Sequence, residues 1–329
     1  MKINLQNYDV IGIIGLAKNT GKTTTLNALI KDLPADQTAI TSIGLDGETI
    51  DQLTYLPKPK IYAKKGIIIA TTTECLKQSY LDYETIESTN IKTAIGRVII
   101  VKIISEGYIV VAGPTTNSAL KTIIKKLKKY AKKILIDGAF NRLTFANIDC
   151  IGGIILATGA SVNASMEKTV EYTQSILASF HYPKVKYDLP LQAPMMVQTG
   201  KETFFVKKKT SQALHQLNFK EPLQRLYIKG AITPSLIDGF IKHDIRNFTL
   251  ILEDATKLLI PPKYYKHLKT LNIEIVVRQA INLIAVTINP TSPKGINYPK
   301  KDFLEAIQAI STVPVYNVKE SEEADETHP

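Results

Sequence analysis

The first 180 residues alternate short apolar runs with longer polar stretches. The apolar runs, rich in isoleucine, valine and leucine, predict buried strands at 8–14, 39–43, 66–71, 97–104, 108–112, 134–137 and 153–157. The stretches between them predict helices at 22–31, 121–133 and 164–179. Because strands and helices interleave, this part of the chain is expected to form a mostly parallel sheet with helices on both faces.

The alternation stops at 181–221 and then resumes. Pro183, Pro190 and Pro194 interrupt this segment, so we predict a connecting region there. Beyond it, strands are predicted at 226–228, 249–252, 273–277, 283–288 and 313–318, and helices at 234–241, 262–270 and 302–310. The expected division is an α/β domain over 1–180, a connecting region over 181–221, a smaller α/β domain over 222–318 and an acidic, disordered tail over 319–329.

The composition is that of a globular protein. The 329 residues are 44% hydrophobic and 22% charged, and no apolar run approaches the roughly 18 residues that a membrane helix needs. The first apolar stretch leads into a polar loop without a cleavage site, so no signal peptide is expected. Cys75 and Cys150 give neither a disulfide framework nor metal-ligand spacing. We therefore expect a cytoplasmic protein without membrane association.

The net charge of +11 is unevenly distributed. Residues 121–133 contain seven lysines and no acid, while the tail 319–329 contains one lysine against five acids. The excess over the rest of the chain is mild and spread out, so nucleic acid is not expected as a main partner. We interpret the lysine-rich segment as a solvated helix face, with a docking surface for a protein as the alternative.

The motif with the most specific chemistry lies at 15–25, between a predicted buried strand and a helix. Backbone N–H groups that end at a helix N-terminus form a cradle for phosphates. Gly21 allows close approach of the backbone, Lys22 would reach the β and γ phosphate oxygens, and the Thr23 hydroxyl would ligate Mg²⁺. The expected phosphate-binding residues are Gly15, Lys18, Asn19, Thr20, Gly21, Lys22, Thr23 and Thr24.

The glycine spacing of this loop departs from the usual phosphate-loop pattern. That pattern has a glycine five positions before Gly21, where this chain has Leu16, and Gly15 lies one position too early. A dinucleotide-binding glycine pattern fits less well, because Gly12 and Gly15 do not complete it and Lys22 would have no role. The alternative is a glycine-rich turn whose lysine and threonines are ordinary residues of a helix N-terminus.

A carboxylate at the end of another buried strand is expected to hold the water shell of the Mg²⁺ ion. Asp137, after three aliphatic residues, is the first candidate, and Asp46 is the second. Glu48 is a candidate for orienting an attacking water molecule. The catalytic residues expected are therefore Lys22, Asp137, Asp46 and Glu48, with Thr23, Asp137 and Asp46 at the metal. The alternative for Asp46 and Glu48 is a glycine-rich turn with two solvated acids.

Other segments bear on the nucleotide more weakly. The chain has no Asn-Lys-x-Asp guanine motif, which favours ATP over GTP. Residues 158–161 would contact the base or ribose, or would simply begin a helix. Residues 113–117 are either a switch loop or a capped turn, and 289–295 are either a functional loop of the second domain or a rigid connection. The five histidines lack ligand spacing, so a metal held by histidine is not expected.

Several motifs, in order along the chain, resemble one protein family. They are 14–23, 41–48 with Ile50 and Asp51, 61–66, 111–114 with Asn117 and Ser118, 136–139, 157–161, and 287–290 with Ser292 and Pro293. Together they resemble the ATPase-type subunit of the lysine 5,6-aminomutase reactivases, and the early glycine at position 15 matches that family. The resemblance implies a P-loop NTPase-like sheet that binds ATP and Mg²⁺.

The resemblance also implies a role and partners. Lysine 5,6-aminomutase uses adenosylcobalamin and pyridoxal phosphate in lysine fermentation, and side reactions leave damaged cobalamin bound to it. A reactivase couples ATP hydrolysis to release of that cobalamin, and a second reactivase subunit is expected to work with this one. This chain has no Asp-x-His-x-x-Gly cobalamin motif, which fits a protein that does not hold the cofactor through a histidine.

Two other functions stay open at this level. The first is a P-loop enzyme of cofactor biosynthesis, or a nucleotide-dependent chaperone, of the dethiobiotin-synthetase or molybdopterin-guanine-dinucleotide type. The second is a nucleotide-sensing scaffold that does not hydrolyse its ligand.

Overall fold

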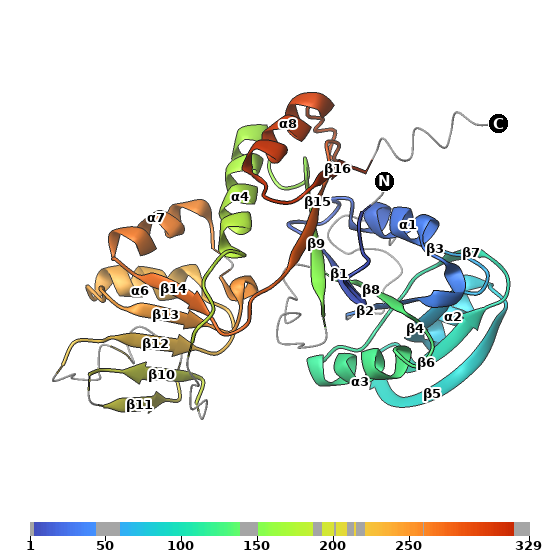
Figure 1. The fold of residues 1–329 in the computed structure, drawn as a ribbon, viewed down its shortest axis with the longest axis horizontal. Coiled ribbons are helices and arrows are strands. Elements are labelled where there is room, and N and C mark those ends of the chain that lie inside the picture. The colour runs from blue at the N-terminus through green and yellow to red at the C-terminus, as the bar shows by residue number, and fades with distance from the viewer. Residues whose placement is uncertain are drawn as a thin grey trace. The chain divides into compact units, whose positions relative to one another are not determined.

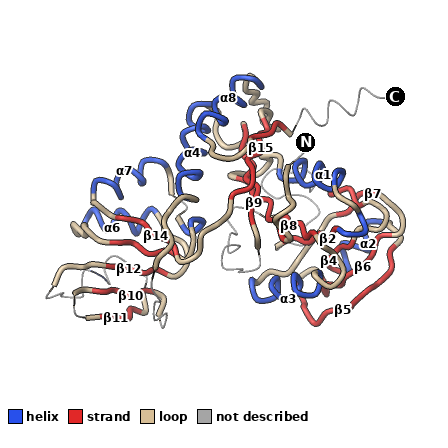
Figure 2. Tube along the Cα trace, in the orientation of Figure 1, coloured by secondary structure: helices blue, strands red, loops and turns tan. Residues whose placement is uncertain are grey.

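The computed structural model describes residues 3–43, 60–138, 151–186, 193–200, 202–208, 214, 221–258 and 260–318. The chain divides into two compact units (Figures 1 and 2). The first unit consists of Met1–Thr169 together with Asn282–Pro329, and the second is Val170–Ile281. The second unit is therefore an insertion in the chain of the first.

A nine-stranded sheet forms the centre of the first unit. Its strands are β1 (Val10–Gly15), β2 (Thr38–Ser42), β4 (Ile68–Thr72), β5 (Tyr83–Thr93), β6 (Gly96–Ile103), β8 (Lys133–Asp137), β9 (Gly153–Gly159), β15 (Leu283–Asn289) and β16 (Val315–Asn317). The order is β16-β15-β9-β1-β8-β2-β4-β6-β5. Every pair from β16 to β4 is parallel, and β6 and β5 are antiparallel to their neighbours. The predicted α/β class with a mostly parallel sheet is confirmed.

Helices cover both faces of this sheet. The helices that lie wholly in the first unit are α1 (Lys22–Asp32), α2 (Thr73–Ser79), α3 (Asn117–Leu127) and α8 (Lys300–Ile310). Ile11 and Ile13 of β1 share a core with Leu26 and Leu29 of α1. Side chains alternate along a strand, so the buried Val10 belongs to the other face. Figure 1 shows α1 and α3 on opposite sides of the sheet. A small antiparallel pair, β3 (Ile61–Ala63) with β7 (Gly107–Ile109), adds to the α1 side.

The lysine-rich helix is displaced from its predicted bounds. Helix α3 begins after Thr116, whose hydroxyl accepts the N–H of Ala119 at 3.3 Å, and ends at Leu127. Its apolar face is buried through Leu120, Ile123, Ile124 and Leu127. Lys133 lies instead in β8, where its ammonium donates to the carbonyl groups of Leu5 and Tyr8 at 2.7 and 2.8 Å. The prediction of one helix over 121–133 was wrong at its end, because a lysine-rich sequence does not show that Lys133 serves a strand.

The strand order reverses at β1. The chain first builds β2 and later β8 on one side of β1, and then β9, β15 and β16 on the other side. In open α/β sheets, ligands bind at the carboxyl ends of the strands where the order reverses. The loop from β1 to α1 lies at that point.

The second unit contains its own five-stranded sheet, of order β11-β10-β12-β13-β14. Its strands are β10 (Met195–Gln198), β11 (Thr203–Val206), β12 (Arg225–Ile228), β13 (Thr249–Leu252) and β14 (Glu274–Val277), with helices α6 (Pro234–Lys242) and α7 (Pro262–Thr270). Strands β12, β13 and β14 are parallel, and β10 and β11 are antiparallel. Helix α4 (Met166–Ser179) begins in the first unit and continues into the second.

This division differs from the expected one at three places. Residues 170–180, expected in the first domain, belong to the second unit. The predicted connecting region 181–221 contains β10 and β11, which pair within the smaller sheet. Residues 282–318, expected in the smaller domain, belong to the first unit, where 283–289 form β15 beside β9 of the large sheet. The apolar pattern at 283–288 predicts that strand without showing which sheet it joins. Of the helices in the described part of the chain, none has the length and apolar character needed to cross a bilayer.

Candidate functional site

The loop between β1 and α1 is hydrogen-bonded to the sheet at its start and to the first turn of α1 at its end. The N–H of Leu16 donates to the carbonyl of Ala157 on β9 at 2.9 Å. The Thr20 hydroxyl donates back to the Ala17 carbonyl at 3.1 Å and so closes the loop on itself. The N–H of Thr25 donates to the Gly21 carbonyl at 2.8 Å, which is the first hydrogen bond of the helix. The loop is therefore a compact turn that leads directly into a helix N-terminus.

The backbone at this N-terminus favours an anion. Gly21 is the N-cap of α1 with φ 88°, and Asn19 has φ 60°, so both are in the left-handed region. Gly21 has no side chain to cap the helix, and the first turn contains no acidic residue. The positive end of the helix dipole and the N–H groups of the first turn are therefore not neutralised by a side chain of the loop. Such an arrangement binds phosphate groups in many proteins.

The structure explains the early glycine at position 15. A Cβ on Gly15 would lie 2.8 Å from Cγ of Lys22 and still closer to the Thr20 hydroxyl. Lys22 and Thr20 thus fold directly over the Gly15 backbone. Leu16, at the position where the usual pattern has glycine, is buried and 6% exposed. The close approach that needs a glycine therefore occurs one residue earlier than the usual spacing places it.

Asp137 ends β8, the strand that pairs directly with β1. It lies opposite Ile13 of β1 and Ser42 of β2, and its carbonyl accepts the N–H of Ile43 at 3.1 Å. Its Oδ1 atom is buried and has no hydrogen-bond partner. Burial raises the pKa of Asp137, and the positive charge of Lys22 and the N–H of Gly138 oppose that rise. The Asp137 carboxylate thus has a buried acceptor atom without a partner and interacts electrostatically with Lys22. This fits a carboxylate whose missing hydrogen bond or metal contact is supplied by a ligand.

A metal ion at this site would take most of its oxygen ligands from bound phosphate groups and water. Among the described residues, no three His, Cys, Asp or Glu side chains gather closely enough to hold a metal ion. Mg²⁺ commonly uses one or two protein oxygens together with phosphate oxygens and water. Thr23, in the first turn of α1, and Asp137 supply protein oxygens of the right kind.

The other predicted site residues have different outcomes. Lys18 is exposed on the loop and Thr24 is half-buried in the first turn of α1. Asp46 and Glu48 lie outside the described residues, within 44–59. Residues 113–117 contain the cap of α3 described above, as the capped-turn interpretation expects. They also pass close to the carbonyl of Ser42, at the end of β2.

Sequence reasoning missed the contribution of β15 to the loop. The Thr287 hydroxyl is 2.9 Å from the Thr25 hydroxyl, inside the core. The Asn289 side-chain amide donates to the Asn19 carbonyl at 3.2 Å. Polar residues at the end of a buried strand were the available signal. The pattern did not show that this strand pairs with β9 and so reaches the loop.

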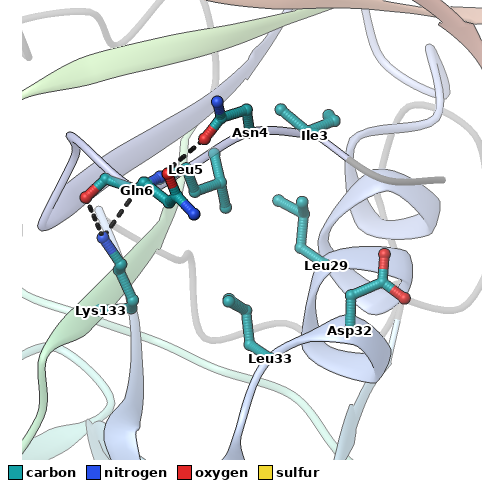
Figure 3. A pocket seen from close by; sticks show the side chains of 8 residues that line it. All are labelled: Ile3, Asn4, Leu5, Gln6, Leu29, Asp32, Leu33 and Lys133. Carbon is teal, nitrogen blue, oxygen red and sulfur yellow. Dashed lines mark hydrogen bonds between the residues drawn. The ribbon is translucent and has the colours of Figure 1, made fainter.

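A pocket of about 490 Å³ lies at the opposite edge of the sheet (Figure 3). It is lined by Ile3, Asn4, Leu5, Gln6, Leu29, Asp32, Leu33 and Lys133. These residues precede β1, end α1 or begin β8, so they lie at the amino ends of the parallel strands. Figure 3 shows the Lys133 ammonium turned to the backbone of Leu5 and Gln6 and away from Leu29 and Leu33. The pocket is therefore separate from the loop between β1 and α1.

A substitution at Gly21 tests the loop conformation. We expect Gly21→Ala to destabilise the protein by about 1–2 kcal/mol, because an alanine is strained at this φ. Its Cβ would also lie 3.1 Å from Val318 Cγ2 and 3.2 Å from Asn289 Cβ. Thermal unfolding should show this loss of stability. If the loop binds a nucleotide, titration with Mg–ATP should also show a loss of affinity.

The matched control for this change is Gly295→Ala. Gly295 has a similar φ of 79°, and a Cβ there would meet nothing within 4 Å. The control should lose thermal stability through strain and keep its affinity for Mg–ATP. Equal losses of affinity in the two variants would mean that Gly21 has no special place in the binding loop.

Comparison with known proteins gives no match. No protein-family model, curated protein or solved structure matches this chain.

Proposed function

We propose that this chain is a P-loop NTPase that binds Mg–ATP at the β1–α1 loop and hydrolyses it. The observation that carries the proposal is the position of Asp137. Its buried, unpartnered oxygen ends the strand beside β1, next to a helix N-terminus without a side-chain cap. An anion cradle and a carboxylate on adjacent strand ends, where the strand order reverses, suit a phosphate chain with its metal ion.

Each residue has a distinct task in this proposal. The N–H groups from Lys18 to Thr24 surround the phosphates, and Lys22 neutralises their oxygens. Thr23 and Asp137 hold Mg²⁺ and its water molecules, and the ion supplies neutralisation of charge on the phosphates. Asp46 and Glu48 are proposed from the sequence alone, as a second metal contact and as a residue that orients water. The absent guanine motif favours ATP.

For the cellular role, we propose a reactivase subunit for an adenosylcobalamin-dependent lysine 5,6-aminomutase. The support is the ordered set of motifs that resemble this family, including the glycine at position 15. In this role, ATP hydrolysis drives release of damaged cobalamin from the aminomutase in the cytoplasm, together with a second reactivase subunit. The second unit of the chain is inserted between β9 and β15.

Release of phosphate from ATP tests this function. The full chain, with the second reactivase subunit, is assayed with no aminomutase, with intact aminomutase and with aminomutase inactivated through its cobalamin. We expect slow basal turnover that inactivated aminomutase stimulates at least several-fold, with exchange of its cobalamin. Titration with Mg–ATP in the absence of partners tests nucleotide binding separately.

Other outcomes of this assay identify the alternatives. A new product from ATP with a small carboxylate or amine would indicate a cofactor-biosynthesis ligase. Tight binding of Mg–ATP without phosphate release under any of the three conditions would indicate a nucleotide-sensing scaffold. Absence of Mg–ATP binding would contradict the P-loop assignment itself.

A further inference from the structure

Two side chains from neighbouring strand ends hold the carbonyl group of Asn19. Nδ2 of Asn289, at the end of β15, donates to this oxygen at 3.2 Å, and the Ser161 hydroxyl, just after β9, donates at 3.3 Å. Asn19 is one of the few non-glycine residues with positive φ among those described. We call Asn289 and Ser161 the Asn19 clamp. The clamp therefore holds the carbonyl of a residue whose left-handed backbone conformation is unfavourable for a residue with a side chain.

The orientation of the Asn289 amide follows from its other contacts. Its Oδ1 accepts the N–H of Thr291 at 3.2 Å and the Thr291 hydroxyl at 3.0 Å. The Thr291 N–H can only donate, so the amide atom that it meets must be the oxygen Oδ1. The amide nitrogen Nδ2 is therefore the atom that faces the Asn19 carbonyl. The Asn289 backbone carbonyl accepts the N–H of Ala160 at 2.9 Å, which joins the two segments that carry the clamp. Asn289 is only 8% exposed, so it is held in one position.

Fixing the Asn19 carbonyl also fixes the next N–H group. In a trans peptide the C=O and the following N–H point in opposite directions, and no peptide bond in the described chain is cis. The Thr20 N–H therefore points away from the clamp. Thr20 itself is 1% exposed and its hydroxyl is bonded to Ala17, so its peptide has little freedom to turn.

We propose that Asn289, assisted by Ser161, is a positioning residue that aims the Thr20 N–H at the bound phosphate. This inference rests on the proposed function, because it names residues that prepare the same loop for its ligand. Asn289 also backs Gly21, since a Cβ on that glycine would lie 3.2 Å from Asn289 Cβ. A single side chain thus supports both left-handed residues of the loop. A loop that is already ordered before the anion binds loses less conformational entropy on binding, so its affinity for the anion is higher.

The test compares Asn289→Ala with Asn282→Ala. Asn282 directly precedes β15, and its Nδ2 donates to the backbone carbonyl of Gly152 at 2.9 Å, so the control loses the same kind of bond at the opposite end of the strand from the loop. Calorimetric titration with Mg–ATP gives both the affinity and the fraction of competent sites. We expect Asn289→Ala to bind at least about 10-fold more weakly at unchanged stoichiometry, and Asn282→Ala to bind as the wild type.

The titration separates positioning from damage to the fold. Partial unfolding lowers the fraction of competent sites at unchanged affinity, while a misaimed N–H lowers the affinity of every site. Wild-type affinity in Asn289→Ala, or a loss of stoichiometry alone, would overturn the proposal. So would an equal loss of affinity in Asn282→Ala.

A second variant decides the matter if Asn289→Ala does not fold. Ser161→Ala removes the other donor of the clamp from a partly exposed position, and we expect about 2- to 5-fold weaker binding of Mg–ATP. Unchanged affinity in that variant would then overturn the proposal. If the wild-type chain itself does not bind Mg–ATP, it is the proposed function that fails. If the wild type binds and the clamp variants bind equally well, only the positioning role fails.

Discussion

Lys22→Ala is expected to bind Mg–ATP about 100-fold more weakly than the wild-type chain while keeping its fold. Hydrogen bonds between an ammonium and phosphate oxygens contribute up to about 3 kcal/mol, which corresponds to this factor. Lys22 is half-buried at the start of α1 and folds over Gly15. Alanine is a good helix former, so the helix should begin at the same residue. Calorimetric titration measures the affinity, and circular dichroism with thermal unfolding reports the fold.

The matched control for Lys22→Ala is Lys125→Ala. Lys125 is exposed on α3, so this variant carries the same change of charge on a surface far along the chain from the loop. It should bind Mg–ATP as the wild type does. If Lys22→Ala binds with unchanged affinity, the phosphate site has been assigned to the wrong loop.

Asp137→Asn should change stability and nucleotide binding in opposite directions. Without nucleotide, the variant should be more stable than the wild type at pH 7, by on the order of 1 kcal/mol, because it removes a carboxylate whose burial is only partly offset by Lys22 and the N–H of Gly138 and whose Oδ1 has no hydrogen-bond partner. With nucleotide, Mg²⁺-dependent binding and hydrolysis of ATP should fall about 10- to 100-fold, since the residue that we propose to hold the metal's water shell loses its charge.

The pH dependence of the stability gain follows from the direction of the pKa shift. Burial raises the pKa of Asp137 above its value in the unfolded chain, against the opposing effect of Lys22. The folded state therefore holds this proton more tightly, and the contribution of Asp137 to stability falls as the pH rises through the window between the two pKa values. The advantage of Asp137→Asn should accordingly be largest above the raised pKa and should shrink on acidification toward the unfolded value of about 4.

An exposed carboxylate gives the control for this experiment. Asp82 lies exposed in the turn before β5, and Asp82→Asn should alter neither the stability in this pH window nor the response to Mg–ATP. If Asp137→Asn is instead less stable at pH 7 and binds Mg–ATP normally, Asp137 serves the apo fold and does not hold a metal.

Elements made from contiguous, strongly patterned residues were predicted well. Strand β1, helix α1 and the loop between them lie where the sequence placed them, because a buried apolar run and a glycine-rich turn before a helix are local signals. The edge strand β5 was missed, since it is mostly exposed and has no apolar face to reveal it. Strands β10 and β11 were missed for a related reason, because prolines and charged residues surround them.

The sequence by itself determined the class of the fold and the place of the loop after β1. It also determined the choice of Lys22 and Asp137 as candidate site residues, from their residue types and their positions beside buried strands. These depend on periodicity and on residue chemistry over short spans. Only the tertiary structure decided that β15 returns to the large sheet and brings Asn289 to Asn19 across 270 positions of the chain. Strand pairing is a long-range choice that many sequences of similar pattern could make. The residues that support the loop therefore became visible only when the strands were placed side by side.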